Sequence, residues 1–181
     1  MKKGKGVLTV LALLTGMAQA HPVDEVVQGA YLTLAPGAVQ LELDLTPGPL
    51  VAGPFITALD PNADGRVTVN EARAYAVSVL RQSTLTIDGK AAGWTVDRVD
   101  VPSLESLKVG SDTLKIYATA RRPDRAGAAT LSYQNRYQPA NSQWMANVFL
   151  LPGAGWTYRV SGQQHSNDGR QLTVTYVAAR T

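Results

Sequence analysis

A short polar segment between positions 60 and 71 has residue types and a spacing suited to binding calcium. Asp60, Asn62 and Asp64 stand at its first, third and fifth places, Gly65 at the sixth and Glu71 at the twelfth. Ca²⁺ is a hard cation that takes six to eight oxygen ligands at about 2.3–2.6 Å, so alternate side chains of a tight loop must converge on it. Oxygen-bearing residues at these places, with glycine at the turn, predict a calcium site.

This segment resembles the loop of an EF-hand. The resemblance implies that Arg66 contributes its backbone carbonyl, that Thr68 acts through its hydroxyl or a water, and that Glu71 supplies both carboxylate oxygens. Gly65 permits the sharp turn because a residue without Cβ adopts positive φ at no steric cost. Val67 lies where an apolar residue anchors such a loop on a neighbouring hydrophobic surface.

The elements that must position this loop are helical. A helix is predicted from Glu71 to Leu80, in a segment that opens with good helix formers. The entering helix is expected to be only a short turn, residues 55–59, since prolines and glycine precede it; the whole unit would span about residues 50–81. Ala72 departs from the larger apolar residue usual after the glutamate. The alternative is a polar turn leading into a helix capped by Asp64 or Thr68.

The first 20 residues read as a secretory signal peptide. Lys2, Lys3 and Lys5 precede an apolar stretch at 7–17 and the small-residue site at 18–20, with cleavage predicted after Ala20. The apolar stretch is shorter than the 20 or so residues of a membrane span. A signal anchor is the alternative. We expect a periplasmic or secreted protein whose mature chain starts at His21 and has no transmembrane segment.

Removal of this segment changes the charge balance. Its three lysines belong to the 17 basic residues of the chain, and the 14 that remain equal the 14 acidic residues. Nucleic-acid binding is disfavoured, since it usually needs a basic face. Arg121, Arg122 and Arg125 are expected to form a solvated strand end and not a phosphate site. With no cysteine, the exported chain must fold without disulfides, and bound calcium could supply part of that support.

Most of the remaining chain is predicted to be β-structure. Residues 31–34 and 39–45 alternate apolar and polar side chains around a Pro-Gly turn, and residues 156–160 and 171–177 flank an Asn-Asp-Gly turn. Further strands are predicted in a set of short segments: 85–87, 94–96, 114–118 and 130–133. Short strands at this spacing predict an α+β, mostly β fold. It would be a single domain, residues 21–181, an antiparallel β-sandwich with one inserted EF-hand.

The order of these features resembles the exported N-terminal domain of bacterial nickel/cobalt permeases and of hydrogenase/urease-accessory transporters. The resembling segments are His21-Pro22, residues 31–34, the loop 60–71 with its helix, residues 85–89 and residues 135–164. This chain ends where those proteins begin their membrane helices. The resemblance therefore implies at most an accessory to a metal-uptake system, with a protein partner at the cell envelope.

The two histidines allow a second metal hypothesis. His21 would offer an amino group and an imidazole at the mature N-terminus, and His165 a third nitrogen, a donor set that suits copper. The alternative is a mobile terminus and a surface histidine. An enzyme is not expected: Ser161 and Ser166 near His165 form no nucleophile elbow, and the pair Asp97 and Asp100 reads as strand-edge charges.

The region between residues 133 and 158 is rich in aromatic residues, expected to pack in the core or to form a platform for a partner protein or a glycan. They are Tyr133, Tyr137, Trp144, Phe149, Trp156 and Tyr158. The calcium site remains the most specific prediction. Its calcium is expected to be structural, since one loop without a second does not make the paired hand of a sensor.

Overall fold

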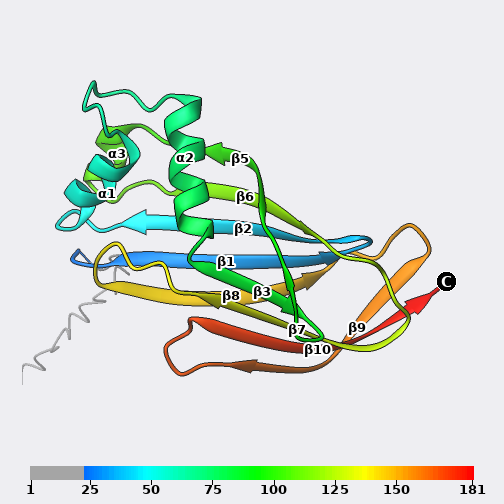
Figure 1. Ribbon diagram of the computed structural model, residues 1–181. Coiled ribbons are helices and arrows are strands. Elements are labelled where there is room, and N and C mark those ends of the chain that lie inside the picture. The colour runs from blue at the N-terminus through cyan, green and yellow to red at the C-terminus, as the bar shows by residue number, and fades with distance from the viewer. Residues whose placement is uncertain (1–22) are drawn as a thin grey trace, which may run out of the picture.

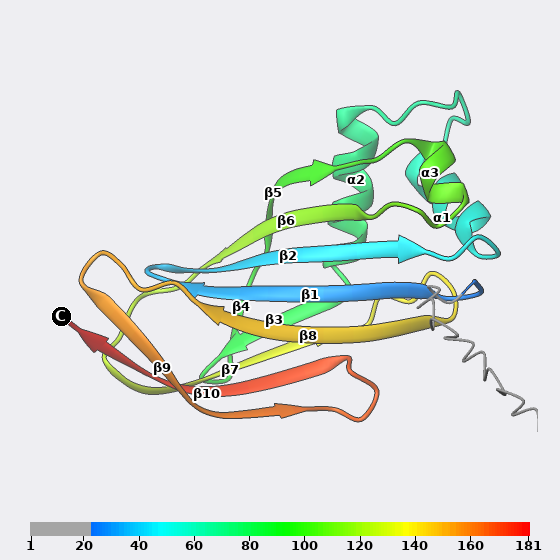
Figure 2. The same cartoon turned by 180° about the vertical axis from the view of Figure 1, so that it is seen from behind.

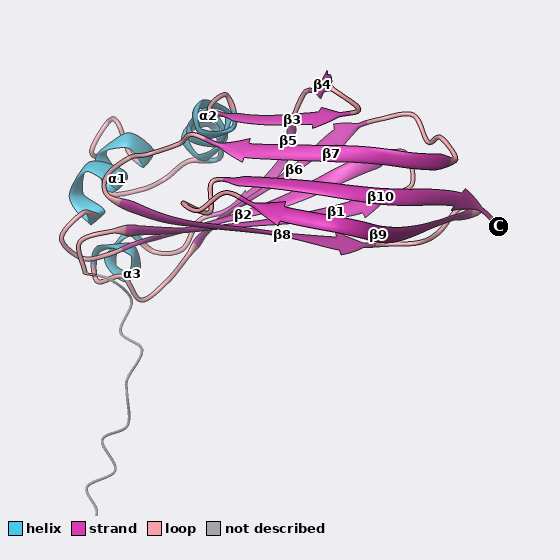
Figure 3. Cartoon of the chain, turned by 90° about the horizontal axis from the view of Figure 1, so that it is seen from below, coloured by secondary structure: helices cyan, strands magenta, loops and turns pink. Residues whose placement is uncertain are grey.

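The computed structural model describes residues 23–181, so the predicted signal peptide and His21 lie outside the described residues (Figure 1). Two five-stranded sheets face each other as two layers, which Figure 3 shows edge-on. Helices gather at one end of the layers, and the C-terminus lies at the other (Figure 1). The predicted mostly-β, sandwich-like α+β fold is confirmed at this level.

The first sheet, sheet A, has the strand order β5-β6-β2-β1-β8. Its strands are β1 (Val26–Ala35), β2 (Ala38–Pro47), β5 (Thr95–Asp100), β6 (Leu114–Arg121) and β8 (Ser142–Leu150). The predicted first hairpin is β1–β2, which turns at Gly37 with φ of 72°. All neighbours are antiparallel except β1 and β8, which run parallel, so the prediction of an antiparallel sheet is wrong for this pair.

The second sheet, sheet B, has the strand order β4-β3-β7-β10-β9 and is antiparallel throughout. Its strands are β3 (Ser83–Ile87), β4 (Lys90–Ala92), β7 (Gly127–Asn135), β9 (Trp156–His165) and β10 (Gln171–Arg180). The predicted hairpin β9–β10 is present, and β3 forms a hairpin with the short β4, which was not predicted. Strand β5 follows β4 in the chain but crosses to sheet A, where it pairs with β6.

The core lies between the two sheets, and period-2 alternation explains how it forms. Successive side chains of a strand point to opposite faces, so every second residue of β2 and β6 is buried. Sheet A contributes mostly aliphatic side chains, while sheet B adds tyrosines. The largest fully buried side chains of the two sheets are Leu32, Leu34, Leu41, Leu43, Leu45, Leu85, Leu114, Tyr133 and Tyr176.

Three helices lie together at one end of the sandwich, the helical end (Figures 1 and 2). They are α1 (Ala52–Leu59), α2 (Val69–Leu80) and α3 (Leu104–Lys108). Within residues 23–181 no helix is long and apolar enough to cross a membrane. The opposite end, the strand end, holds the β1–β2 turn and the segment Arg121–Arg125, which begins at the last residue of β6.

Candidate metal site

The predicted calcium loop joins α1 to α2 and projects from the helical end (Figure 1). Helix α1 starts at Ala52, earlier than the predicted turn at residues 55–59. The prediction of a shorter helix is wrong because Pro54 falls in the first helical turn, where its missing N–H has no acceptor to lose. Asp60 is the C-cap residue that follows α1, and its N–H donates to the carbonyl of Ile56 at 2.8 Å.

The side chains of the loop hold its backbone in a tight turn. The N–H of Gly65 donates to Asp60 Oδ2 at 3.0 Å, that of Asp64 to Asn62 Oδ1 at 3.0 Å, and that of Arg66 to Asp64 Oδ1 at 2.8 Å. Gly65 has φ of 78°, as the glycine at that place requires. The three oxygen-bearing side chains at alternate places therefore shape the loop through hydrogen bonds to its own backbone.

Asp60 differs from the other oxygen-bearing residues at alternate places of the loop in its burial. Only 5% of it is exposed, whereas Asn62 and Asp64 lie at the surface. Within residues 23–181, its Oδ1 is buried and has no hydrogen-bond partner. A buried carboxylate oxygen without a donor is costly, because that oxygen has lost water and gained no hydrogen bond in exchange. A cation at Oδ1 would remove that cost, so Asp60 fits the first place of a calcium loop.

The loop ends in a capping box. Thr68 is the N-cap of α2: its hydroxyl accepts from the N–H of Glu71 at 3.2 Å, and Glu71 Oε2 accepts from the N–H of Thr68 at 2.8 Å and from its hydroxyl at 2.7 Å. The alternative reading of a capped helix start is thus correct for Thr68. A capped helix start is compatible with the predicted calcium loop, because the same N-terminal turn keeps Glu71 close to the loop.

The carboxylates are not gathered into one cluster in this structure. No group of three or more His, Cys, Asp or Glu side chains in the described chain is placed to hold a metal ion. The bonds to Thr68 explain this for Glu71, whose carboxylate is engaged at the helix start. Calcium ligation would require Glu71 to turn from Thr68 toward Asp60 and Asp64.

The loop lies beside the apolar segment that leads into α3. Val67 is half-buried and packs against the core, as predicted for an anchoring residue. Val67 and Gly65 border a hollow whose far wall is formed by Val101 and Leu104, at the start of α3. This single loop therefore packs against an apolar segment at the helical end of the same chain. In paired EF-hands the corresponding contact is made with a second loop.

Helix α2 is fixed to the sandwich by buried aromatic and polar contacts. The Tyr75 ring packs edge-on against Phe55 of α1 at 5.5 Å between centroids and against Tyr137 at 6.3 Å, and the Tyr75 and Tyr137 hydroxyls lie 2.6 Å apart. Gln28 of β1 donates to the Tyr137 carbonyl at 3.0 Å. Burial raises the pKa of both tyrosine hydroxyls. The site is thus built on a helix tied to both sheets.

The copper hypothesis rests on a residue outside the described chain, His21, and so stays a prediction. The other proposed ligand, His165, is exposed at the end of β9, with its Nε2 atom 2.8 Å from Gln163 Nε2. The serines considered as nucleophiles have other partners: Ser161 donates to the Thr175 carbonyl, and Ser166 to Asp168.

The aromatic residues divide between the core and the surface. Tyr133, Tyr137 and Tyr158 are buried, which agrees with packing, whereas Phe149 is 52% exposed. Phe149 and Tyr31 lie 6.4 Å apart on the outer face of sheet A, at the border of a hollow of about 790 Å³.

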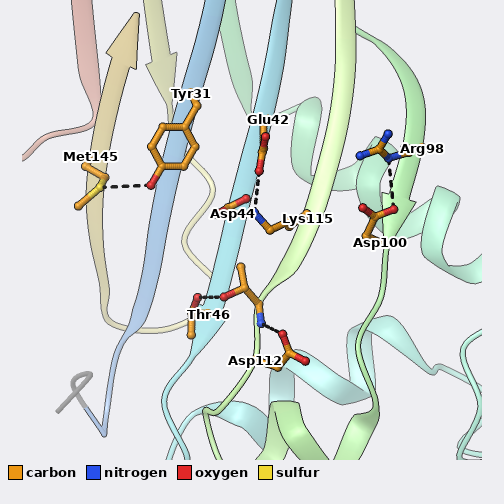
Figure 4. Close-up of polar contacts among 10 residues, drawn as sticks. Tyr31, Glu42, Asp44, Thr46, Arg98, Asp100, Asp112, Lys115 and Met145 are labelled. Carbon is orange, nitrogen blue, oxygen red and sulfur yellow. Dashed lines mark hydrogen bonds and ion pairs between the residues drawn. The ribbon is translucent and has the colours of Figure 1, made fainter. Parts of the chain in front are cut away.

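Figure 4 shows the polar side chains on this outer face. Lys115 Nζ lies between Glu42 Oε1 at 2.6 Å and Asp44 Oδ2 at 3.1 Å. The bond to Glu42 raises the pKa of Lys115, while burial raises the pKa of Asp44. Arg98 is paired with Asp100 at 3.3 Å. Both bases here are paired, but the acids Glu42, Asp44, Asp97 and Asp100 outnumber them, so the face carries a net negative charge.

At the strand end the structure corrects the prediction of solvated arginines. Arg122 is buried, with 8% of it exposed, while Arg121 and Arg125 are exposed as predicted. Arg122 Nη1 pairs with Asp124 Oδ1, two residues further on, at 3.1 Å. The β1–β2 turn holds this pair, because Asp124 Oδ2 accepts from the N–H of Gly37 at 2.7 Å and Arg122 Nη2 donates to the carbonyl of Ala35 at 3.3 Å. These two contacts join residues 87 apart in the chain, which no local pattern in the sequence indicates.

Compared with protein-family models, curated proteins and solved structures, the chain matched none. Its resemblance to permease-associated domains and to EF-hands therefore stays a prediction. The loop geometry is the remaining guide to function.

Proposed function

We propose that the protein is an exported calcium-binding protein that uses a single EF-hand-like loop. Asp60, Asn62, Asp64 and Glu71 would supply side-chain oxygens, Arg66 its backbone carbonyl, and Thr68 a hydroxyl or a bridging water. The observation that carries the proposal is the buried Oδ1 of Asp60, which has no partner within residues 23–181.

Calcium would have a structural effect at this place. The ion would neutralise the buried Asp60 and link the end of α1 to Glu71 in the first turn of α2. A ligand that binds only the folded state stabilises it by about 2.7 kcal/mol at a hundred times its Kd. The affinity expected for a lone extracellular loop is about 10⁻⁴–10⁻³ M, which suits calcium concentrations outside the cytoplasm.

Isothermal titration calorimetry of the chelator-treated protein with CaCl₂ tests the proposal. We expect one site, weakened at least about tenfold in Glu71→Gln and in Asp60→Asn, because each loses a carboxylate ligand. Glu105→Gln is the matched control, since Glu105 is an exposed carboxylate beside the loop, paired with Lys108. A parallel CuCl₂ titration tests His21 and His165.

Two results of these titrations would contradict a calcium site in the loop. Absence of calcium heat and of any thermal shift up to about 10 mM CaCl₂, a concentration ten times the weak end of the expected range, would reduce the loop to a capped turn. Equal affinity in Glu71→Gln and the unmodified protein would place the bound calcium elsewhere.

A further inference from the structure

A small cavity lies at the strand end, away from the calcium loop. It has a volume of about 260 Å³ and lies between the β3–β4 hairpin of sheet B and the segment that follows β6 of sheet A. Figures 1 and 2 show that this end is opposite the helices. A volume just below the usual range of ligand pockets, about 300–1,000 Å³, suits a small molecule.

A buried cation lines this cavity. The Arg122 side chain is 6% exposed, and its guanidinium contacts Asp124, the carbonyl of Ala35 at 3.3 Å and the ring faces of Tyr158 and Tyr176 at 5.5 and 6.0 Å. Its Nε is buried and has no hydrogen-bond partner within residues 23–181. A buried guanidinium N–H without an acceptor favours any ligand that supplies one.

The rim of the cavity adds further positive charge. Lys90, Arg121 and Arg125 line it and are all exposed. One acid, Asp88, lines it as well, and its Oδ1 already accepts from the N–H of Thr130 at 2.8 Å. Three bases against one acid give the entrance a positive potential, which attracts anions.

The rest of the lining is apolar. Ile87, Ala92 and Ala129 contribute aliphatic surface, and Tyr176, which is 1% exposed, contributes part of its ring. An inorganic anion would gain nothing from these walls, whereas the apolar part of an organic anion would be removed from water there.

We propose that this cavity binds a small organic anion, a carboxylate attached to a compact apolar body. The carboxylate would lie against Arg122 Nε and the basic rim, and the body against Ala129 and Tyr176. Planar guanidinium groups match carboxylate oxygens in geometry as well as charge. This site shares no residue with the calcium loop, so a failure of the calcium proposal would leave the anion site untouched.

Titration followed by protein-observed NMR, in chelator, tests this with 3-phenylpropionate as the probe. The neutral 3-phenylpropanamide has almost the same shape, and inorganic phosphate has charge without an apolar body. We expect saturable binding of 3-phenylpropionate, at least about tenfold tighter than either control, because a hydrogen bond to a charged group contributes about 1.5–3 kcal/mol.

Two variants separate charge from shape. Arg125→Gln should weaken 3-phenylpropionate binding by reducing the positive potential, and Ala129→Leu should abolish it by filling the cavity. Arg159→Gln is the matched control, because Arg159 is exposed on β9 and does not line the cavity. Thermal unfolding of each variant verifies that it is folded.

Three results would overturn the proposal. They are no binding at 10 mM probe, a concentration about tenfold above a weak millimolar Kd; equal binding of the neutral amide; and binding of phosphate as tight as that of 3-phenylpropionate. Unchanged binding in folded Ala129→Leu would show that the probe binds at another surface, and this result would also overturn the proposal.

Discussion

The helical end and the strand end of the sandwich each bury one charged side chain, and the two charges have opposite signs. Asp60 at the helical end leaves Oδ1 without a partner in the described chain, and Arg122 at the strand end leaves Nε without one. One end thus offers an acceptor to a cation, and the other offers a donor to an anion. A buried charge with an unpartnered atom is destabilising unless an opposite charge or other hydrogen bonds compensate it.

The compensation differs between the two ends. Arg122 is paired with Asp124, which in turn accepts from the Tyr158 hydroxyl at 3.2 Å and from the N–H of Gly37. The Asp60 carboxylate accepts from Gly65 N–H, a bond within its own loop. The difference teaches that burial alone does not identify a ligand site: Arg122 has a structural partner and Asp60 has none of opposite charge within the described residues.

The largest effect on stability should come from removing Arg122 from its buried ion pair with Asp124. Arg122→Met leaves Asp124 charged and only 16% exposed, so we expect a loss of about 3–5 kcal/mol in the free energy of unfolding. Asp60→Asn, measured in chelator, should cost about 1 kcal/mol or less, since it keeps an acceptor for Gly65 and removes an uncompensated charge. Urea unfolding followed by circular dichroism measures both.

Arg125→Met controls for the general loss of a basic side chain, since Arg125 is exposed, and should change stability by no more than about 0.5 kcal/mol. Equal losses for Arg122→Met and Asp60→Asn would contradict the distinction between a paired and an unpaired buried charge.

The two ends also differ in how much of them the sequence predicts. The loop from Asp60 to Glu71 is contiguous, so its turn, its glycine and its capping box follow from local rules. The strand end depends on partners far apart in the chain: Asp124 bonds to Gly37, and Arg122 to Ala35. The alternation of β6 places Arg122 on the core-facing side, but nothing local indicates the distant partners that accompany its burial.

The same contrast holds for the sheets. Hairpins such as β1–β2 were predictable because alternation and turn residues are local signals. Strand β8 was not predicted, because apolar residues occupy both of its faces: Trp144 and Val148 face the core side, while Met145 and Phe149 are exposed. Its parallel pairing with β1 joins segments more than a hundred residues apart. Helix α3 was too short for periodicity to reveal.

Tyrosines allow a second comparison of the ends, through alkaline pH. Burial raises the pKa of Tyr75 and Tyr137 at the helical end, and of Tyr158 and Tyr176 at the strand end, above the usual value of 10. Above pH 10 the native state therefore retains protons that the unfolded state has lost. Its stability is fully present below pH 10 and falls as the pH rises further.

Tyr75→Phe should cost about 1–2 kcal/mol at neutral pH, because it leaves the buried Tyr137 hydroxyl without its partner, and it should make the alkaline loss shallower. Tyr158→Phe should cost less, since Asp124 keeps Arg122 and Gly37 as donors. Guanidinium chloride unfolding between pH 7 and 11 measures both. A steeper alkaline loss in Tyr75→Phe than in the unmodified protein would contradict the assignment of the titration to this pair.

The smallest effect concerns the capping box, where stability and calcium binding compete for Glu71. Thr68→Ala removes the hydroxyl that accepts from the N–H of Glu71, so in chelator it should lower the free energy of unfolding by about 1 kcal/mol. Thr68→Ser keeps the hydroxyl and is the matched control.

In saturating calcium the gap between Thr68→Ala and the unmodified protein should change. Glu71 then leaves Thr68 for the ion, and the unmodified protein loses the bond between the Glu71 carboxylate and the Thr68 hydroxyl, which Thr68→Ala already lacks. Urea unfolding at each calcium concentration gives this gap directly. A gap that stays constant from chelator to 10 mM CaCl₂, about ten times the weakest expected Kd, would mean that Glu71 never leaves the capping box. The helical end would then have a capped helix and a buried Asp60, but no twelfth-place ligand.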